Sequence, residues 1–74
     1  MITMKALVGR INRRLAKEGQ ILRRTRGGRA ELDLGDYFVH DRFRNNILET
    51  HVDPVEYGKE LGVLNEWERV EEID

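Results

Sequence analysis

The chain has no cysteine and no serine among its 74 residues. Without cysteine it can form neither disulfide bonds nor thiolate metal sites. Because the two commonest catalytic nucleophiles are both missing, most covalent hydrolase mechanisms are excluded. Carboxylates are frequent, but no pair stands out as a general acid and base, and so short a chain rarely forms a deep pocket beside its core. We therefore expect a protein that is not an enzyme, with no catalytic residues, no bound metal and no cofactor.

Long apolar runs are missing as well. Residues 1–19 contain no stretch suited to a signal peptide or a membrane span, which predicts a cytoplasmic protein without a membrane partner. The length allows one small domain over residues 1–74. Such a chain buries only about 60% of the surface that its unfolded form exposes. Small chains without disulfides or metals often dimerise to enlarge their core, so we expect a homo-oligomer.

The net charge of −1 hides a strong asymmetry along the chain. Residues 1–30 contain nine Lys or Arg and one acid, a net charge of +8, whereas residues 31–74 contain four Lys or Arg and thirteen acids, a net charge of −9. A chain polarised in this way can bind a polyanion through its basic part. Alternatively, the two parts can pair with each other, within one chain or between two.

The first segment predicts an amphipathic helix. Thr3 is suited to the N-cap, Gly19 to a left-handed C-cap, and apolar residues recur between them at helical spacing: Met4, Leu7, Val8, Ile11 and Leu15. At roughly 100° per residue, four cations fall in a stripe beside the apolar one: Arg10, Arg13, Arg14 and Lys17. The helix is therefore expected to be apolar on one side and strongly basic along a flank.

Four more cations follow this helix. We predict a strand over Gln20–Arg26 and a loop over Gly27–Gly35, with one helical turn at Arg29–Leu32; together they add Arg23, Arg24, Arg26 and Arg29. Eight cations within 20 residues are typical of a surface that binds phosphates by releasing counterions. We therefore predict a nucleic-acid-binding module whose partner is duplex DNA or another polyanion. In the alternative, these arginines pair with acidic protein surface: Glu31, Asp33, Asp36 and the acidic C-terminal half.

The segment DYFVHDRFRNNILETHVD predicts a β-hairpin that turns at Asn45–Asn46, because asparagine accepts the positive φ of a type I′ turn. A two-residue turn places Phe43 opposite Leu48 and His40 opposite His51. One face then collects apolar residues: Tyr37, Val39, Phe43, Leu48 and Val52. The other face is mixed: Phe38, His40, Arg42, Arg44, Ile47, Glu49 and His51.

The predicted pair of His40 and His51 suggests two minor functions. Side chains paired across strands lie close enough for both imidazoles to reach one metal ion, although zinc sites normally need three or four protein ligands. Two clustered imidazoles could instead make an interface sensitive to pH. In the alternative function, a protein-interaction module, we expect the contact to be made by the open sheet face or by Trp67, with these interface residues: Phe38, His40, Ile47, His51 and Trp67.

The C-terminal part begins with a second predicted helix. Asp53 can cap it, Pro54 suits its first position, Glu56 completes a capping-box pattern and Gly62 ends it. Residues 65–74 are expected to form a helical or frayed acidic tail, with Trp67, Val70 and Ile73 along one side. A helix-turn-helix is disfavoured because its second helix would offer four glutamates to DNA. The order of elements predicts a two-layer α+β domain: helix, three-stranded antiparallel sheet, helix.

This order is similar to that of the double-stranded-RNA-binding domain, which has about this length. That family places a lysine-rich motif at the start of its last helix, where this chain reads DPVEYGKE with only Lys59. The resemblance therefore implies little about RNA binding.

Two longer segments, INRRLAKEGQILRRTRGGRAELDLGDYFV and THVDPVEYGKELGVLNEWE, carry a second resemblance. They resemble short uncharacterised proteins of proteobacterial plasmids and integrated mobile elements, which share the basic first helix, the THVD turn and the ELGVL–WE ending. That group offers no functional residue to transfer. The resemblance implies a bacterial accessory protein, a class in which DNA-related partners are common.

Overall fold

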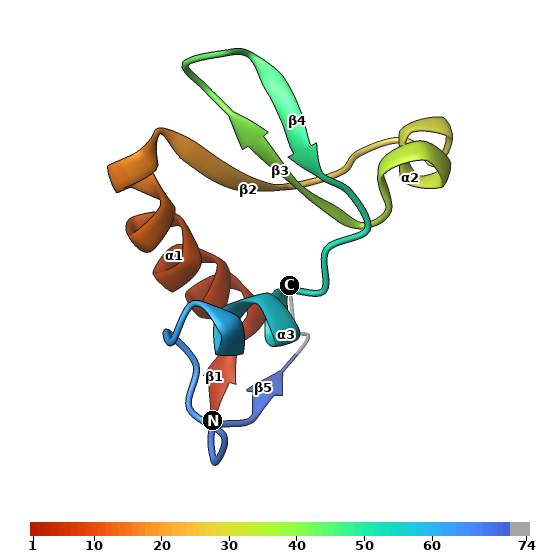
Figure 1. Ribbon diagram of the computed structural model, residues 1–74. Coiled ribbons are helices and arrows are strands. Elements are labelled where there is room, and N and C mark those ends of the chain that lie inside the picture. Colours follow the sequence, from red (N-terminus) through yellow and green to blue (C-terminus); the bar gives the residue numbers. More distant parts are fainter. Residues whose placement is uncertain (72–74) are drawn as a thin grey trace.

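The structure, a computed structural model, describes residues 1–71, with residues 30 and 31 described by their backbone alone. Along the chain it contains β1 (Ile2–Thr3), α1 (Met4–Leu15), the 3-10 turn η1 (Ala16–Glu18), β2 (Gln20–Arg24), α2 (Gly28–Leu34), β3 (Tyr37–Asp41), β4 (Asn46–Glu49), α3 (Pro54–Glu60) and β5 (Val70–Glu71) (Figure 1). The predicted α+β class, with its three-stranded antiparallel sheet, is confirmed. No helix in the described part is long and apolar enough to cross a membrane.

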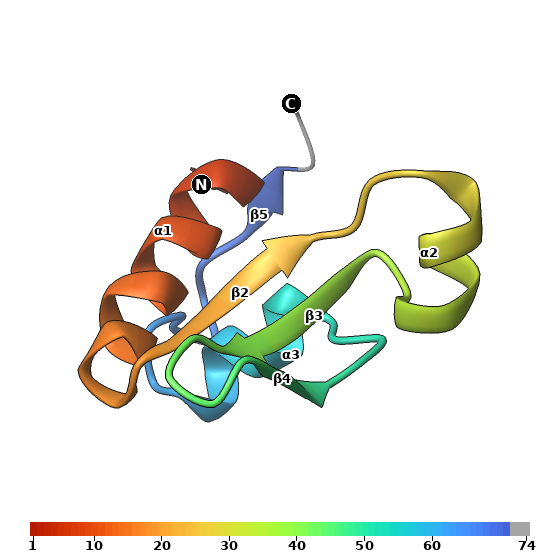
Figure 2. The ribbon, with the colours of Figure 1, turned by 90° about the horizontal axis from the view of Figure 1, so that it is seen from above.

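The main sheet has the strand order β2-β3-β4. Helices α1 and α3 lie on one side of it, while α2 extends beyond its end; seen from above, the other face is not covered by a helix (Figures 1 and 2). The core lies between the sheet and α1 and consists of seven buried apolar residues: Met4, Leu7, Ile11, Leu15, Leu22, Val39 and Leu64. One face of the sheet is therefore packed and the other is open.

Helix α1 forms as its sequence predicts. The hydroxyl of Thr3 accepts a hydrogen bond from the Ala6 N–H at 3.1 Å, which satisfies one of the free donors of the first turn. After α1, η1 ends at Gly19, whose φ of +70° lies in the left-handed region that glycine adopts without strain. The apolar stripe is buried and the basic flank faces outward, so the polarity of this helix fixes how it packs.

Two contacts join α1 to its neighbours. The Asn12 side chain bonds to both backbone groups of Leu22: its Nδ2 donates to the carbonyl at 3.2 Å, and its Oδ1 accepts from the N–H at 2.7 Å. On another side, α3 approaches α1 at Gly58, where a Cβ would lie 2.9 Å from Leu7 Cδ1. A larger residue here would push the end of the Leu7 side chain aside, so glycine favours the close packing of these helices.

The predicted register of the hairpin is wrong. Strands β3 and β4 pair Asp41 with Asn46, His40 with Ile47 and Val39 with Glu49, with an irregularity between the last two pairs. The loop has four residues instead of two because the Asp41 carboxylate accepts hydrogen bonds from the N–H groups of Phe43 and Arg44, at 2.9 and 3.1 Å. Asn45 does take a positive φ, of +54°, but it ends this longer turn.

The wrong register also changes the predicted faces. Phe43 and Leu48, which were expected on the buried face, are 83% and 43% exposed. Val39 is buried as predicted, and His40 lies opposite Ile47 and not His51. The hairpin thus exposes much of the apolar surface that was assigned to the core.

The second predicted helix is confirmed over Pro54–Glu60, with the Asp53 carboxylate accepting from the Val55 N–H at 3.0 Å. The helical end expected from residue 65 is not found in the part that the structure describes, and Ile73 lies outside it. Residues 66 and 67 form a turn, and β5 follows, paired in parallel with β1 so that Ile2 lies opposite Val70. The helix-turn-helix interpretation fails for the same reason.

The Glu68 carboxylate explains why the chain turns after Asn65. Its Oε1 accepts from the backbone N–H and from the side-chain Nδ2 of Asn65, at 3.0 and 3.1 Å. The same carboxylate accepts from Arg10 of α1. A helix beginning at Asn65 would share some of these local bonds, but the contact with α1 holds the segment as a turn and directs the chain towards β1.

Candidate nucleic-acid interface

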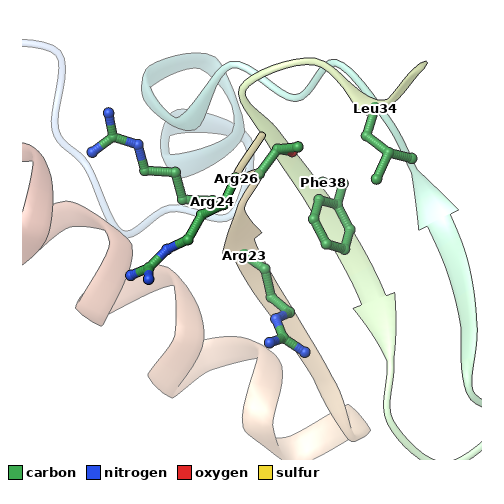
Figure 3. A pocket seen from close by; sticks show the side chains of 6 residues that line it. Arg23, Arg24, Arg26, Leu34 and Phe38 are labelled. Atoms are coloured by element: carbon green, nitrogen blue, oxygen red, sulfur yellow. The ribbon is translucent and has the colours of Figure 1, made fainter. Parts of the chain in front are cut away.

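The structure divides the eight predicted cations into groups that belong to different surfaces. The α1 group consists of Arg10, Arg13, Arg14 and Lys17, which line a hollow of about 480 Å³ together with Val63. The β2 group consists of Arg23, Arg24 and Arg26, which line an open hollow of about 660 Å³ together with Thr25, Leu34 and Phe38 (Figure 3). Arg29 lies on α2 and lines neither hollow.

Arg10 differs from the rest of the α1 group because it has partners within the protein. Its Nη1 donates to both oxygens of Glu68 at 3.0 Å and to the Val63 carbonyl at 3.2 Å. Hydrogen bonds from Asn65 and Arg10 hold the pKa of Glu68 below its ordinary value. Arg10 therefore serves chiefly to join α1 to the C-terminal segment, and Arg13, Arg14 and Lys17 form the exposed remainder of the group.

Most of the eight cations have no acidic partner among the described residues. The one ion pair between two described residues is that of Arg10 and Glu68. Arg24 also interacts with another group of the protein, so it is not counted among the unpaired cations. Among the eight predicted cations, those that are exposed and have no ion pair to a described residue are Arg13, Arg14, Lys17, Arg23, Arg26 and Arg29.

Part of the acidic charge gathers elsewhere. Burial raises the pKa of Tyr57 on α3, and Glu49, Glu18 and Glu60 raise it further. These carboxylates come from β4, η1 and α3, so three elements place negative charge near one phenol. This local concentration of acids involves none of the cations of the β2 group.

The β2 hollow combines charge with an aromatic ring. Arg23 lies directly opposite Phe38 in the β2–β3 pairing. In Figure 3 the Phe38 ring lies between Arg23 and Leu34, while Arg24 and Arg26 extend away from it on the other side of β2. Thr25 is only 5% exposed, and its buried hydroxyl has no hydrogen-bond partner within the described residues. Such a hydroxyl is unusual because buried polar groups are almost always paired.

The five predicted interface residues do not form one surface. Phe38 and His40 lie on the middle strand, and Ile47 lies opposite His40 on β4. His51 donates its backbone N–H to the Leu34 carbonyl, at the α2 end of β3. Trp67, 79% exposed, belongs to the turn before β5, which lies on the helix side of the sheet (Figure 1). Four of the five residues therefore belong to the sheet or the segment at its end, and Trp67 lies on another side of the molecule.

The proposed pairing of His40 and His51 is wrong, so the metal and pH-sensitive interpretations that depended on it lose their basis. His40 instead places its Nε2 3.1 Å from Asn45 Oδ1, in the hairpin loop. The described residues contain no group of three or more His, Cys, Asp or Glu side chains that could hold a metal ion.

Three residues that line the hollows were not predicted: Thr25, Leu34 and Val63. Thr25 could have been found, because strand alternation places it on the same side as Arg23. Leu34 and Val63 reach the hollows only through the positions of α2 and the segment after α3. Local sequence carries no signal for such contacts.

Comparison with known proteins gives no match: no protein-family model, curated protein or solved structure is significantly similar to this chain. The resemblance to short proteins of plasmids and mobile elements stays a prediction.

Proposed function

We propose that this protein binds nucleic acid through phosphate contacts made by the exposed cations of the α1 and β2 groups. The observation that carries the proposal is that Arg13, Arg14 and Lys17 stand together on one helix flank without a carboxylate partner among the described residues. Arg23 and Arg26 add exposed cations at the second hollow. Cations left unpaired in this way attract a polyanion over the range of the Debye length, about 8–10 Å in ordinary buffers.

The proposed binding is largely independent of base sequence. Long cationic side chains on a helix flank contact phosphates, which carry no sequence information, and each contact releases counterions from the polymer. Affinity for duplex DNA should therefore fall steeply with salt, with a slope of about −0.9 in log K against log salt concentration for each phosphate contact.

Fluorescence anisotropy with a labelled duplex at about 50 mM salt, where phosphate contacts are least screened, tests the proposal. The triple variant Arg13→Gln, Arg14→Gln, Lys17→Gln should weaken binding and reduce the salt slope by roughly 0.9 for every phosphate that is no longer neutralised. The matched control is Arg42→Gln, Arg44→Gln, Lys59→Gln, which removes the same charge from three exposed positions outside both groups.

Two results would overturn the proposal. One is the absence of binding at micromolar protein and low salt. The other is an equal loss of affinity in the triple variant and its control, which would mean that total charge and not the α1 group attracts DNA.

A second candidate function is assembly or protein interaction, favoured by the apolar side chains that the hairpin exposes. Phe43 is 83% exposed, and Ile47 and Leu48 are 45% and 43% exposed on β4, an edge strand whose outer side pairs with no other strand in the described part of the chain. Copies of the chain that join through this hairpin should give a mass above 8.7 kDa in light scattering. A strictly monomeric mass, with no change in the Phe43→Ala, Ile47→Ala variant, contradicts this candidate.

A further inference from the structure

We propose that the β2 hollow binds an unpaired nucleotide, with its base against Phe38 and its phosphate beside Arg23. This inference rests on the proposed function and gives it a substrate class, single-stranded nucleic acid. It separates the β2 hollow from the α1 group, whose cations stand on a helix flank and suit any phosphate backbone.

The shape of the hollow suits a single nucleotide. Its volume of about 660 Å³ falls within the range of roughly 300–1,000 Å³ that is usual for small-molecule sites. Strand alternation places Phe38 on the face opposite to the buried Val39, and no helix covers that face of the sheet in Figure 2, so α1 and α3 leave the ring accessible to a polymer. A closed pocket would admit a free nucleotide but not a chain.

The chemistry of the lining favours an unpaired base over a duplex. A flat aromatic ring binds a base by stacking, and every base offers the same kind of face, so such a site tolerates sequence. In a duplex those faces are already stacked on neighbouring bases. Phe38 is half-buried, which holds the ring in place while part of it meets the hollow. Such a site therefore selects strands whose bases are exposed.

Positive charge lies beside the Phe38 ring, as a nucleotide with a stacked base and an attached phosphate requires. Arg23 is directly opposite Phe38 across the two strands, and its exposed guanidinium can contact a phosphate attached to a stacked base. Arg26 is also exposed and lines the hollow, but its side chain extends away from Phe38, so Arg23 is the cation next to the ring. Aromatic side chains combined with a basic groove are the usual means of binding single strands.

The unpartnered hydroxyl of Thr25 is a second and independent feature of the same hollow. Its Oγ1 has no hydrogen-bond partner among the described residues although the residue is almost fully buried. The hydroxyl lies just beneath the wall of the hollow, so a polar group of the ligand would give it the partner that buried polar groups usually have only if this wall shifts on binding. The Thr25 hydroxyl has no evident role in packing, because a valine, which has the same shape, would fill the same space.

The test measures anisotropy of labelled single-stranded DNA, single-stranded RNA and duplex DNA of equal length, with wild type and two phenylalanine variants. Phe38→Leu should weaken single-strand binding about tenfold and leave duplex binding nearly unchanged. Phe43→Leu is the matched control, because the chain has only these two phenylalanines and Phe43 does not line this hollow. Phe38→Tyr keeps the ring and should retain single-strand affinity, which guards against a folding defect in Phe38→Leu.

The outcomes separate this inference from the proposed function. If the protein binds both forms and Phe38→Leu weakens neither, or weakens both equally, the inference is overturned and phosphate binding stands. If Phe38→Tyr loses as much single-strand affinity as Phe38→Leu, the effect is not stacking and the inference is again overturned. If no nucleic acid binds at all, both proposals fail. Preference for RNA or for DNA supports the inference in either case.

Discussion

Helix α1 and strand β4 both carry apolar side chains, but different forces hold them in place. Helix α1 buries four apolar side chains, and Leu7 and Ile11 have no exposed surface at all. Strand β4 buries none of its residues, and its two apolar side chains remain 43–45% exposed. The helix is positioned by what it covers, whereas the strand is positioned by its backbone pairing and by the loop that precedes it.

The difference between α1 and β4 shows under which condition a hydrophobic pattern determines the orientation of an element. A pattern fixes orientation where a core lies behind it, because turning the element would expose the whole apolar set. Along β4 no such penalty operates, so the hydrogen bonds from the loop N–H groups to the Asp41 carboxylate decide where the strand begins. Register in this part of the sheet therefore depends on one side chain outside β4.

The largest expected effect comes from removing packing behind α1. Leu7→Ala should destabilise the fold by about 2–5 kcal/mol, because it leaves a cavity against α3. A domain of this size has little more stability than that, so much of the variant should be unfolded at room temperature. Urea denaturation measures the change. Leu48→Ala on β4 is the control, expected to cost less than about 1 kcal/mol; equal losses would contradict the comparison.

A smaller effect is expected from the loop that sets β4. Asp41→Ala removes two acceptor bonds and should destabilise the hairpin by roughly 1 kcal/mol, and the NMR cross-peak between His40 and Ile47 should weaken or disappear. Asp41→Asn keeps an oxygen that can accept the same bonds and should preserve the register. If Asp41→Ala keeps the His40–Ile47 cross-peak at wild-type strength, the loop does not set the register.

The smallest effect concerns the contact between α1 and the C-terminal turn. Because the pKa of Glu68 is lowered in the fold, its ionised form stabilises the protein at neutral pH, and this contribution disappears as pH falls below its ordinary value of 4.5. Glu68→Gln should therefore lower the Tm at neutral pH, and the difference from wild type should shrink steadily as the pH falls below 4.5. Glu66→Gln, at an exposed neighbour, should show neither effect. A constant difference across the pH range would contradict the role of this charge.

The parts of the fold that local sequence predicts are those with local causes. Helix α1 has its cap, its period and its terminal glycine within 17 residues, and α3 has Asp53 and Pro54 at its start. Strand β5 has no local signal, because two residues form a strand only where β1 lies ready to pair with them. The hairpin register lies between these cases: the turn residues are visible in the sequence, but the hydrogen bonds to Asp41 that lengthen the loop depend on a local geometry that the pattern of turn residues does not show.

The candidate site shows the same limit. Composition identified the cations, but their division between two hollows follows from the packing of α1 against the sheet. The pairing of Arg10 with Glu68 joins residues 58 positions apart, and periodicity along a helix cannot reveal which of its cations meets a distant carboxylate. Long-range geometry therefore decided which of the basic residues remain exposed to a ligand.

The two bonds from Asn12 to Leu22 have a further consequence, for solubility. Strand β2 is an edge strand, and an unpaired edge is a template on which a strand of another molecule can add. By occupying the donor and the acceptor of Leu22, the amide side chain closes the middle of that edge to a foreign strand. A single asparagine on α1 thus blocks aggregation through the β2 edge. Strand β4 is then the edge of this sheet at which self-association can begin.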